Sequence, residues 1–318
     1  MKSNAPVLKK LRWLLETLGF LGISFVVAAV PDAVALRFGK WLGRLFFRLL
    51  KKRRTIAIAN IVASLPFLER QADWSRANGT PEDIARKTFE NLGMSLVENF
   101  KIYHGVGQRI IDSVEFTGLE HYENAKAKQR GVAFITGHCG NWELMALSSG
   151  KHLQHVSVVA RPQNNPYLNH ILETIRMKFG NRVIYRSGAL KAMINEFRQN
   201  HIVGVLIDQA VSADEGYLVE FLGRSAWTVR MPALIARKTG VPLIPIFAHR
   251  REGGGHVVTI FPAILPDLEK SGDAGGRADV ARLTAAIEQY VVRHPTEWYW
   301  VHNRWKRAGE PATDGAAG

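Results

Sequence analysis

The chain has 318 residues, of which 47% are hydrophobic and 22% are charged. These proportions are typical of a globular protein and exclude a disordered chain or a polytopic membrane protein. The formal net charge is +14, which favours an anionic partner such as nucleic acid, an anionic bilayer or an acidic carrier protein. The single cysteine, Cys139, excludes an intrachain disulfide and argues against a cysteine-based zinc site.

The N-terminal part of the chain combines an apolar stretch with a basic one. Residues 17–31 carry no charged side chain, but a bilayer span needs about 20 apolar residues, so this stretch is short for one. Residues 37–54 hold eight basic residues and no acidic residue, interleaved with apolar residues at helical spacing. This pattern is typical of a helix that lies in a membrane interface. A helix packed on its own domain would give a similar pattern.

We therefore expect residues 1–54 to be an anchor that dips into, or lies on, the cytoplasmic leaflet of the inner membrane. A signal peptide is the rival interpretation, since a basic start precedes the apolar stretch. The dense positive charge directly after that stretch argues against export. Whether the apolar stretch spans the bilayer or only embeds in it stays open.

The rest of the chain is expected to form one α/β domain over residues 55–307, followed by a disordered tail over 308–318. Residues 55–110 have a helical pattern, with a helix start at Thr80-Pro81. β-rich runs then alternate with helical segments, which predicts a mostly parallel central sheet flanked by helices. The expected strands are 132–136, 156–160, 182–185, 202–207, 242–247 and 256–261. The glycines 253–255 indicate a turn between the last two strands, and a final helix is expected over about 278–293.

The sequence "ITGHCGNWE" places His138 just after the strand 132–136. In an open parallel sheet, functional residues gather at the carboxyl ends of the strands. Gly137 and Gly140 suit a tight turn, and Asn141 is an acceptable helix cap. His138 and Glu143 meet only if the histidine folds back over the first turn of that helix. A carboxylate on one imidazole nitrogen fixes the tautomer and leaves the other nitrogen as a general base for a substrate hydroxyl.

Two alternatives apply to this motif. His138 could be a structural histidine, and Cys139 could be a nucleophile, although adjacent residues at a strand end point to opposite sides. Motifs for other chemistries are absent: the sequence has no G-x-S-x-G, no P-loop, no G-x-G-x-x-G, no H-E-x-x-H and no other tight His/Asp cluster. We therefore expect no metal at the site and no cofactor.

The motif "GHCGNWE" resembles the H-x4-(D/E) motif of glycerolipid acyltransferases. More narrowly, it resembles the late acyltransferases of lipid A biosynthesis, of the lauroyl and myristoyl type, and the phosphatidylinositol mannoside acyltransferases. The resemblance covers roughly residues 15–307, and the family's blocks follow in order. They are "RPQNNPYLN" (161–169), "RSG" (186–188), "LIDQ" (206–209), "VEFLGRSAWT" (219–228) and "EWYWVHNRWK" (297–306). Cys139 is a departure, because relatives often carry Phe or another apolar residue there.

The resemblance implies a glycerolipid acyltransferase-like fold. It also implies transfer of a fatty acyl group from acyl carrier protein or coenzyme A to a hydroxyl of a lipid A precursor or related glycolipid. His138 would be the general base, and Glu143 would orient it. A non-catalytic basic membrane module and an acyl thioesterase are the alternatives. No nucleic acid partner is expected.

The candidate substrate-binding residues are Arg161, Asn165, Arg186, Gly188, Asp208 and Gln209. Arg161, or backbone amides of the Gly140 turn, could stabilise the oxyanion of the thioester, and Arg161 could equally hold a phosphate. Asp208 could hold Arg161 or Arg186, or cap a loop. Gly188 and Gln209 are expected to shape the site, and the aromatic block near the C-terminus is expected to pack in the core.

Overall fold

The computed structural model describes residues 7–310 except positions 76, 78 and 186. Five helices precede most of the sheet: α1 (Val7–Ala29), α2 (Asp32–Leu49), α3 (Lys51–Leu68), α4 (Pro81–Tyr103) and α5 (Gln108–Asp112). The predicted helical region is therefore confirmed. The predicted start of α4 is confirmed in detail, because Thr80 and Asp83 form a reciprocal capping box.

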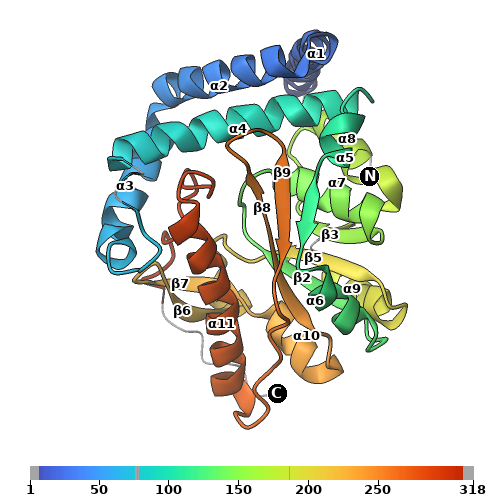
Figure 1. Ribbon diagram of the computed structural model, residues 1–318, viewed down its shortest axis with the longest axis vertical. Coiled ribbons are helices and arrows are strands. Elements are labelled where there is room, and N and C mark those ends of the chain that lie inside the picture. The colour runs from blue at the N-terminus through green and yellow to red at the C-terminus, as the bar shows by residue number, and fades with distance from the viewer. Residues whose placement is uncertain (1–6, 76, 78, 186, 311–318) are drawn as a thin grey trace.

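A seven-stranded sheet forms the centre of the molecule (Figure 1). Only the pair β8/β9 is antiparallel, so the predicted mostly parallel sheet is confirmed. All six predicted strands are present, and β1 was not predicted because it has only three residues. In spatial order the strands are β1 (Glu115–Thr117), β9 (His256–Ile260), β8 (Leu243–Arg250), β2 (Val132–Thr136), β5 (Ile202–Leu206), β3 (Val156–Ala160) and β4 (Arg182–Tyr185).

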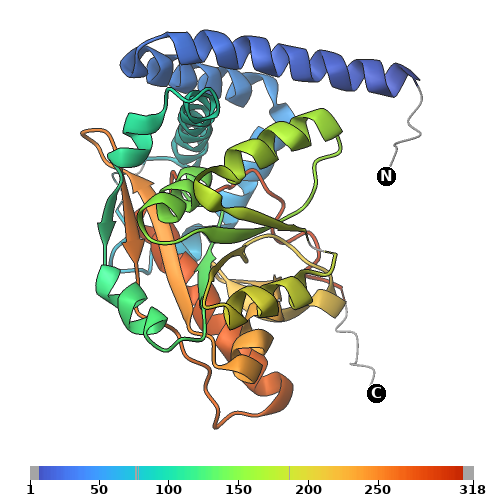
Figure 2. The same ribbon diagram turned by 90° about the vertical axis from the view of Figure 1, so that its right-hand side faces the viewer.

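Helices cover both faces of the sheet, because its strands carry apolar residues that point alternately to either side (Figures 1 and 2). Phe134 of β2 packs on the face that is covered by α6 (Leu119–Lys126), α7 (Trp142–His152) and α8 (Pro166–Arg176). Ile135, its neighbour, packs on the face that is covered by α9 (Ala189–Arg198), α10 (Met231–Thr239) and α11 (Gly272–Arg293).

A separate antiparallel hairpin, β6 (Gly216–Phe221) and β7 (Arg224–Val229), lies beside α11 and was not predicted. Its two-residue loop, Leu222-Gly223, has positive φ at both positions (50° and 75°). That conformation is typical of a type I′ turn, whose twist matches the strands. Short 3-10 helices occupy Lys178–Gly180 and Ala213–Glu215.

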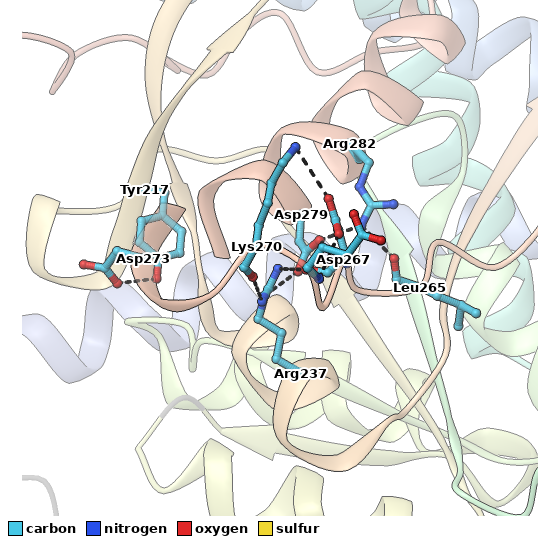
Figure 3. Close-up of polar contacts among 9 residues, drawn as sticks. Tyr217, Arg237, Leu265, Asp267, Lys270, Asp273, Asp279 and Arg282 are labelled. Carbon is cyan, nitrogen blue, oxygen red and sulfur yellow. Dashed lines mark hydrogen bonds and ion pairs between the residues drawn. The ribbon is translucent and has the colours of Figure 1, made fainter. Parts of the chain in front are cut away.

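A buried carboxylate fixes the loop that leads into α11 (Figure 3). Asp279 of α11 is 0% exposed and accepts hydrogen bonds from Arg237 of α10 at 2.6 Å and from Arg282 at 2.5 Å. Arg237 also donates to the backbone oxygens of Asp267 and Lys270. Because a buried charge is tolerated only when it is paired, this cluster stabilises the packing of α10 against α11.

The N-terminal helices pack on α4 at one side of the domain (Figure 2). Gly39 and Gly43 of α2 lie against the backbone of α4 near Gly93, so closely that a Cβ at any of the three would clash. The interpretation of α2 as packed on its own domain is therefore confirmed for this face. Trp41, on another side of α2, is 55% exposed.

Helix α1 is the one helix among the described residues that is long and apolar enough to cross a membrane. Only 17% of its apolar window is buried in the protein. Its contact face mixes apolar and polar residues: Val27 and Phe20 pack against Phe100 of α4. Ser24 Oγ lies 2.9 Å from His104 Nε2 at the end of α4, and Asn165 Nδ2 donates to Trp13 O. Helix α1 therefore lies along the domain, with most of its apolar surface uncovered. The proposed division at residue 54 stays a prediction, and most of the predicted tail lies outside the described residues.

Candidate active site

The turn after β2 is clamped by the C-terminal aromatic segment. His138 O accepts a hydrogen bond from Tyr299 N at 3.0 Å, and Gly140 N donates to Glu297 O at 2.9 Å. Gly140 has a φ of 54°, and a Cβ there would lie 2.1 Å from Ala248 O. Only glycine fits this close approach. The prediction of a tight turn that holds His138 outside the following helix is confirmed, and Asn141 caps that helix as expected.

A buried carboxylate, Asp208, lies on the imidazole of His138. Asp208 follows β5, the parallel neighbour of β2, so both residues reach the same edge of the sheet. Asp208 Oδ1 lies 2.7 Å from His138 Nδ1, and Oδ2 accepts hydrogen bonds from His138 N at 2.9 Å and Trp298 Nε1 at 2.8 Å. A Cβ on Gly137 would lie only 3.2 Å from the carboxyl carbon, so glycine leaves room for this approach.

These contacts keep Asp208 ionised. Burial raises the pKa of Asp208, but the His138 imidazole and the hydrogen bonds from His138 and Trp298 outweigh burial and lower that pKa to about 2. An ionised Asp208 accepts from Nδ1–H and leaves the lone pair of Nε2 exposed on the opposite side of the ring. Gln209 Nε2 lies 3.0 Å from that atom. Nε2 therefore has the hydrogen-bonding state of a general base.

Glu143 has a different partner from the one expected. Its carboxylate is held by the guanidinium of Arg176 on α8, with Nε 2.9 Å from Oε2 and 3.1 Å from Oε1. Burial lowers the pKa of Arg176, but the hydrogen bonds to Glu143 outweigh it and that pKa is raised. The position expected for Glu143, against the imidazole, is occupied by Asp208 because β5 ends beside β2. The role of Glu143 in the reaction stays a prediction.

A cavity of about 410 Å³ connects these residues. It lies between α7 and the sheet, and both His138 and Glu143 line it. Exposed Arg161, Gln163 and Lys306 line one end, and buried apolar residues line the other. The apolar lining includes Phe134, Met145, Val156, Val158 and Ile246. Such a cavity suits a ligand with a polar or anionic head and a long apolar tail.

The predicted substrate-binding residues have different outcomes. Arg161 and Gln209 line the cavity. Asn165 instead caps α8 through Tyr167 N and Leu168 N and binds α1. Gly188, at a φ of 77°, precedes α9 and is not among the residues that line the cavity. Arg186 lies outside the described residues.

Asp208 does not hold Arg161, because its hydrogen-bond partners among the described residues are His138 and Trp298. The suggestion that it holds Arg186 concerns a residue outside the described part of the chain. The suggestion that amides of the Gly140 turn bind an oxyanion is also corrected. The amides of His138, Cys139 and Gly140 donate to Asp208 Oδ2, Gly137 O and Glu297 O respectively. Arg161 is left as the predicted oxyanion partner.

Cys139 is 1% exposed and forms a β-bridge with Trp298. Burial, with smaller contributions from Asp208 and Glu297, raises the pKa of its thiol well above the ordinary value. The structure therefore argues against the alternative in which Cys139 is the nucleophile, because a buried, protonated thiol is a poor nucleophile.

The sequence did not identify the support that the C-terminal segment gives to the site. Arg304, 1% exposed, donates to Gln209 O at 3.2 Å and Trp227 O at 2.5 Å, which ties the hairpin to the loop that carries Asp208. His302 lines the cavity, and burial lowers its pKa to about 4, so it is neutral at pH 7. Trp298 and Trp300 are buried, so the expected core packing of this block is confirmed.

The chain is similar to known proteins over nearly its whole length. The model of a family described as bacterial lipid A biosynthesis acyltransferase matches residues 2–307. The chain is 26% identical over 302 residues to a lipid A biosynthesis lauroyltransferase of Escherichia coli (strain K12), covering 94% of each chain. It is 23% identical over 285 residues to a myristoyltransferase of the same organism, covering 88% of this chain and 82% of the relative. It is 23% identical over 288 residues to a palmitoleoyltransferase of that organism, covering 90% and 89%.

Proposed function

Since the chain belongs to the bacterial lipid A biosynthesis acyltransferase family, we propose that it moves a fatty acyl group from a thioester donor to a hydroxyl of a lipid A precursor. In this proposal, His138 is the general base and Asp208 is the carboxylate that orients it. The contact between Asp208 Oδ1 and His138 Nδ1, at the polar end of an apolar cavity, is the observation that supports this proposal most.

In the proposed reaction, the acceptor hydroxyl replaces the Gln209 amide at His138 Nε2. Nε2 takes the hydroxyl proton while the oxygen attacks the thioester carbonyl. The resulting tetrahedral oxyanion collapses, the carbon–sulfur bond breaks, and the thiolate takes the proton from Nε2. Asp208 stays ionised throughout and stabilises the imidazolium that forms between these steps.

Charge at the open end of the cavity supports an anionic head group on the donor or acceptor. Arg161 and Lys306 are exposed there and line the cavity with His138. We assign Arg161 to the developing oxyanion or to a phosphate of a substrate. Acyl carrier protein and coenzyme A both carry a phosphate at the end of the pantetheine arm that is remote from the thioester, so the basic residues do not distinguish the two donors. No cofactor is required by this scheme.

The N-terminal helices are proposed to bring this site to the cytoplasmic face of the inner membrane. Val7–Ala29 offers exposed apolar side chains along α1, while Ser24 contacts the end of α4 and Thr17 contacts Asn165 at the start of α8. A helix held along the protein in this way suits embedding parallel to the bilayer more than crossing it. The basic residues of 37–54 would then meet anionic lipid head groups.

The test is an assay of purified protein with an acyl carrier protein thioester or an acyl-coenzyme A and a lipid A precursor, with the lipids read by mass spectrometry. We expect the lipid to gain one acyl group, and His138→Ala to lose this activity while His170→Ala, at an exposed histidine of α8, keeps it. Full activity in His138→Ala would refute the proposal. Release of fatty acid without a lipid product would indicate a thioesterase instead.

A further inference from the structure

Three potential metal ligands gather at the amino-terminal edge of the sheet, opposite the edge that carries His138. They are His155, Glu196 and His201, and their ligand atoms lie within 4.8 Å of one another. None of them lines the catalytic cavity. They are up to 46 positions apart in the sequence, so no spacing motif marks them.

Strand pairing brings the two histidines together. His155 directly precedes β3 and His201 directly precedes β5, and these parallel strands pair with Val156 opposite Ile202. The residues before that pair therefore emerge side by side, and their ring centroids are 4.2 Å apart. Because the register of the central sheet fixes this distance, the two imidazoles are held close together without help from a flexible loop.

The last turn of α9 adds the carboxylate. Glu196 Oε2 lies 2.9 Å from His201 Nδ1 and 3.9 Å from His155 Nε2. Tetrahedral Zn²⁺ with bonds of about 2.0–2.1 Å holds its ligand atoms roughly 3.3 Å apart. Glu196 Oε2 and His201 Nδ1 are already no further apart than this. Rotation of the His155 side chain would bring its Nε2 to a similar distance from Glu196 Oε2.

The surroundings favour a ligand role for these groups. His155 Nε2 is buried and has no hydrogen-bond partner among the described residues, which is costly for a polar atom. A metal ion bound at this atom would supply the missing partner, because a neutral imidazole nitrogen is a common metal ligand. Arg182 donates to Glu196 Oε1 at 3.1 Å and leaves Oε2 facing the histidines. Ligating carboxylates commonly have such an outer hydrogen bond.

We propose that His155, Glu196 and His201 bind a divalent transition-metal ion, with Zn²⁺ as the ion that suits two imidazoles and a carboxylate. The fourth position is left for water. Lys126 and Arg182 carry positive charge near the site, so the affinity is expected to be lower than that of a closed structural zinc site. Bound Zn²⁺ would tie β3, β5 and α9 together beside Val156, which lines the buried end of the cavity.

The test titrates Zn²⁺ into tag-free, chelator-stripped full-length protein against a chromophoric zinc indicator. We expect one equivalent to bind the parent protein, and His155→Gln and His201→Gln to weaken binding at least about 10-fold. His170→Gln is the matched control, because His170 is an exposed histidine outside the cluster. It should bind like the parent.

Equal binding by all four proteins would overturn the proposal, and so would equal loss in the control, which would indicate adventitious surface binding. X-ray absorption on the zinc-loaded parent protein gives an answer even if a variant fails to fold. Two imidazole nitrogens and an oxygen at about 2.0–2.2 Å are expected. A shell of water oxygens alone would overturn the assignment.

Discussion

Asp208 Oδ1 lies 2.7 Å from His138 Nδ1, although the two residues are 70 positions apart. The contact joins the carboxyl ends of two adjacent parallel strands, which is where open α/β sheets place their reactive groups. Trp298 and the backbone amide of His138 hold the second carboxylate oxygen, so the carboxylate has a fixed orientation. The imidazole is therefore oriented by a rigid partner before any substrate binds.

Replacing Asp208 by Asn should lower kcat by about 10³–10⁴, because the amide favours the wrong imidazole tautomer. KM should change little, since Asp208 is buried behind the ring. Steady-state kinetics with the acyl donor measure both quantities. The control is Asp214→Asn, which changes an exposed aspartate in the same loop region. A loss confined to KM would contradict a role in orienting the base.

The ion pair between Glu143 and Arg176 gives a second prediction. Each side chain is less than one-fifth exposed, at 18% and 19%, so removing one partner leaves a largely desolvated charge. We expect Glu143→Gln and Arg176→Gln each to lower the free energy of unfolding and the activity. The double variant should lose less than the sum of the two, and denaturant unfolding with parallel assays measures this coupling.

Strictly additive losses would contradict the pairing. If Glu143→Gln alone removed activity while Arg176→Gln kept it, Glu143 would act on the reaction without its arginine. Arg293→Gln is the control for the loss of a charged group, because it removes an arginine from an ion pair with Asp73 whose side chains are 51% and 55% exposed.

The sequence predicted the parallel sheet because its strands are continuous apolar runs, such as "VAFIT" and "IVGVLI", separated by helical segments. It also located the turn at His138, because glycine and asparagine have defined uses at strand ends and helix starts. Each of these two predictions depends on a few residues that are neighbours in the sequence.

The partners of the site residues could not be predicted in the same way. Whether Asp208 or Glu143 meets the imidazole depends on which strands are neighbours, and strand order is a property of the whole sheet. Trp298 reaches Asp208 from 90 positions away, and nothing in an aromatic-rich block distinguishes that tryptophan from Trp300. The cluster of His155 and His201 was missed for the same reason, since only the register of β3 and β5 brings them together.

Gly204 gives a prediction about acyl chain length. It lies in the middle of β5 and lines the cavity, and a Cβ there would meet Val156 Cγ1 at 3.3 Å. Gly204→Val would fill space for two to three methylene groups, at about 0.8 kcal/mol each. We expect the preference for longer over shorter acyl donors to fall by at least about 10-fold.

A series of donors of increasing chain length, compared by kcat/KM, measures this preference. The control is Gly253→Val in the turn between β8 and β9, where a Cβ would meet open space. Equal losses for every chain length in Gly204→Val would show that the acyl chain does not lie along this part of the cavity.

The exposed side of α1 should bind lipid. Leu11, Leu18 and Phe25 are spaced by seven residues and are 52%, 54% and 67% exposed, so they lie on one side of the helix. Replacing Leu11 and Leu18 by Glu should lower binding to anionic vesicles by at least about 100-fold, since burial of each leucine contributes about 1.5 kcal/mol or more. Vesicle sedimentation measures the binding. The control is Leu268→Glu, because Leu268 is 75% exposed but lies in a loop far from α1 in the sequence. Unchanged binding in the double variant would exclude α1 as the anchor.

Glu297 should make the stability of the fold depend on pH near neutrality. Burial raises the pKa of this carboxyl to about 7, although hydrogen bonds from Arg250 and Tyr290 oppose that change. The folded protein therefore holds a proton that the unfolded chain releases near its ordinary value of 4.5. The stabilisation is fully present below pH 4.5 and is lost as the pH rises through 7, at no more than about 1.4 kcal/mol per pH unit.

Glu297→Gln keeps a neutral side chain at every pH and should therefore remove this dependence. We expect its melting temperature, relative to that of the parent, to rise between pH 4.5 and about pH 7 and to level off above that. Thermal unfolding at several pH values measures the difference, and Glu252→Gln, in the exposed turn between β8 and β9, serves as the control. A difference that stays constant over this range would mean that Glu297 is ionised in the folded protein. Its carboxylate would then be a permanent charge behind the turn that carries His138, since Glu297 O accepts the hydrogen bond from Gly140 N.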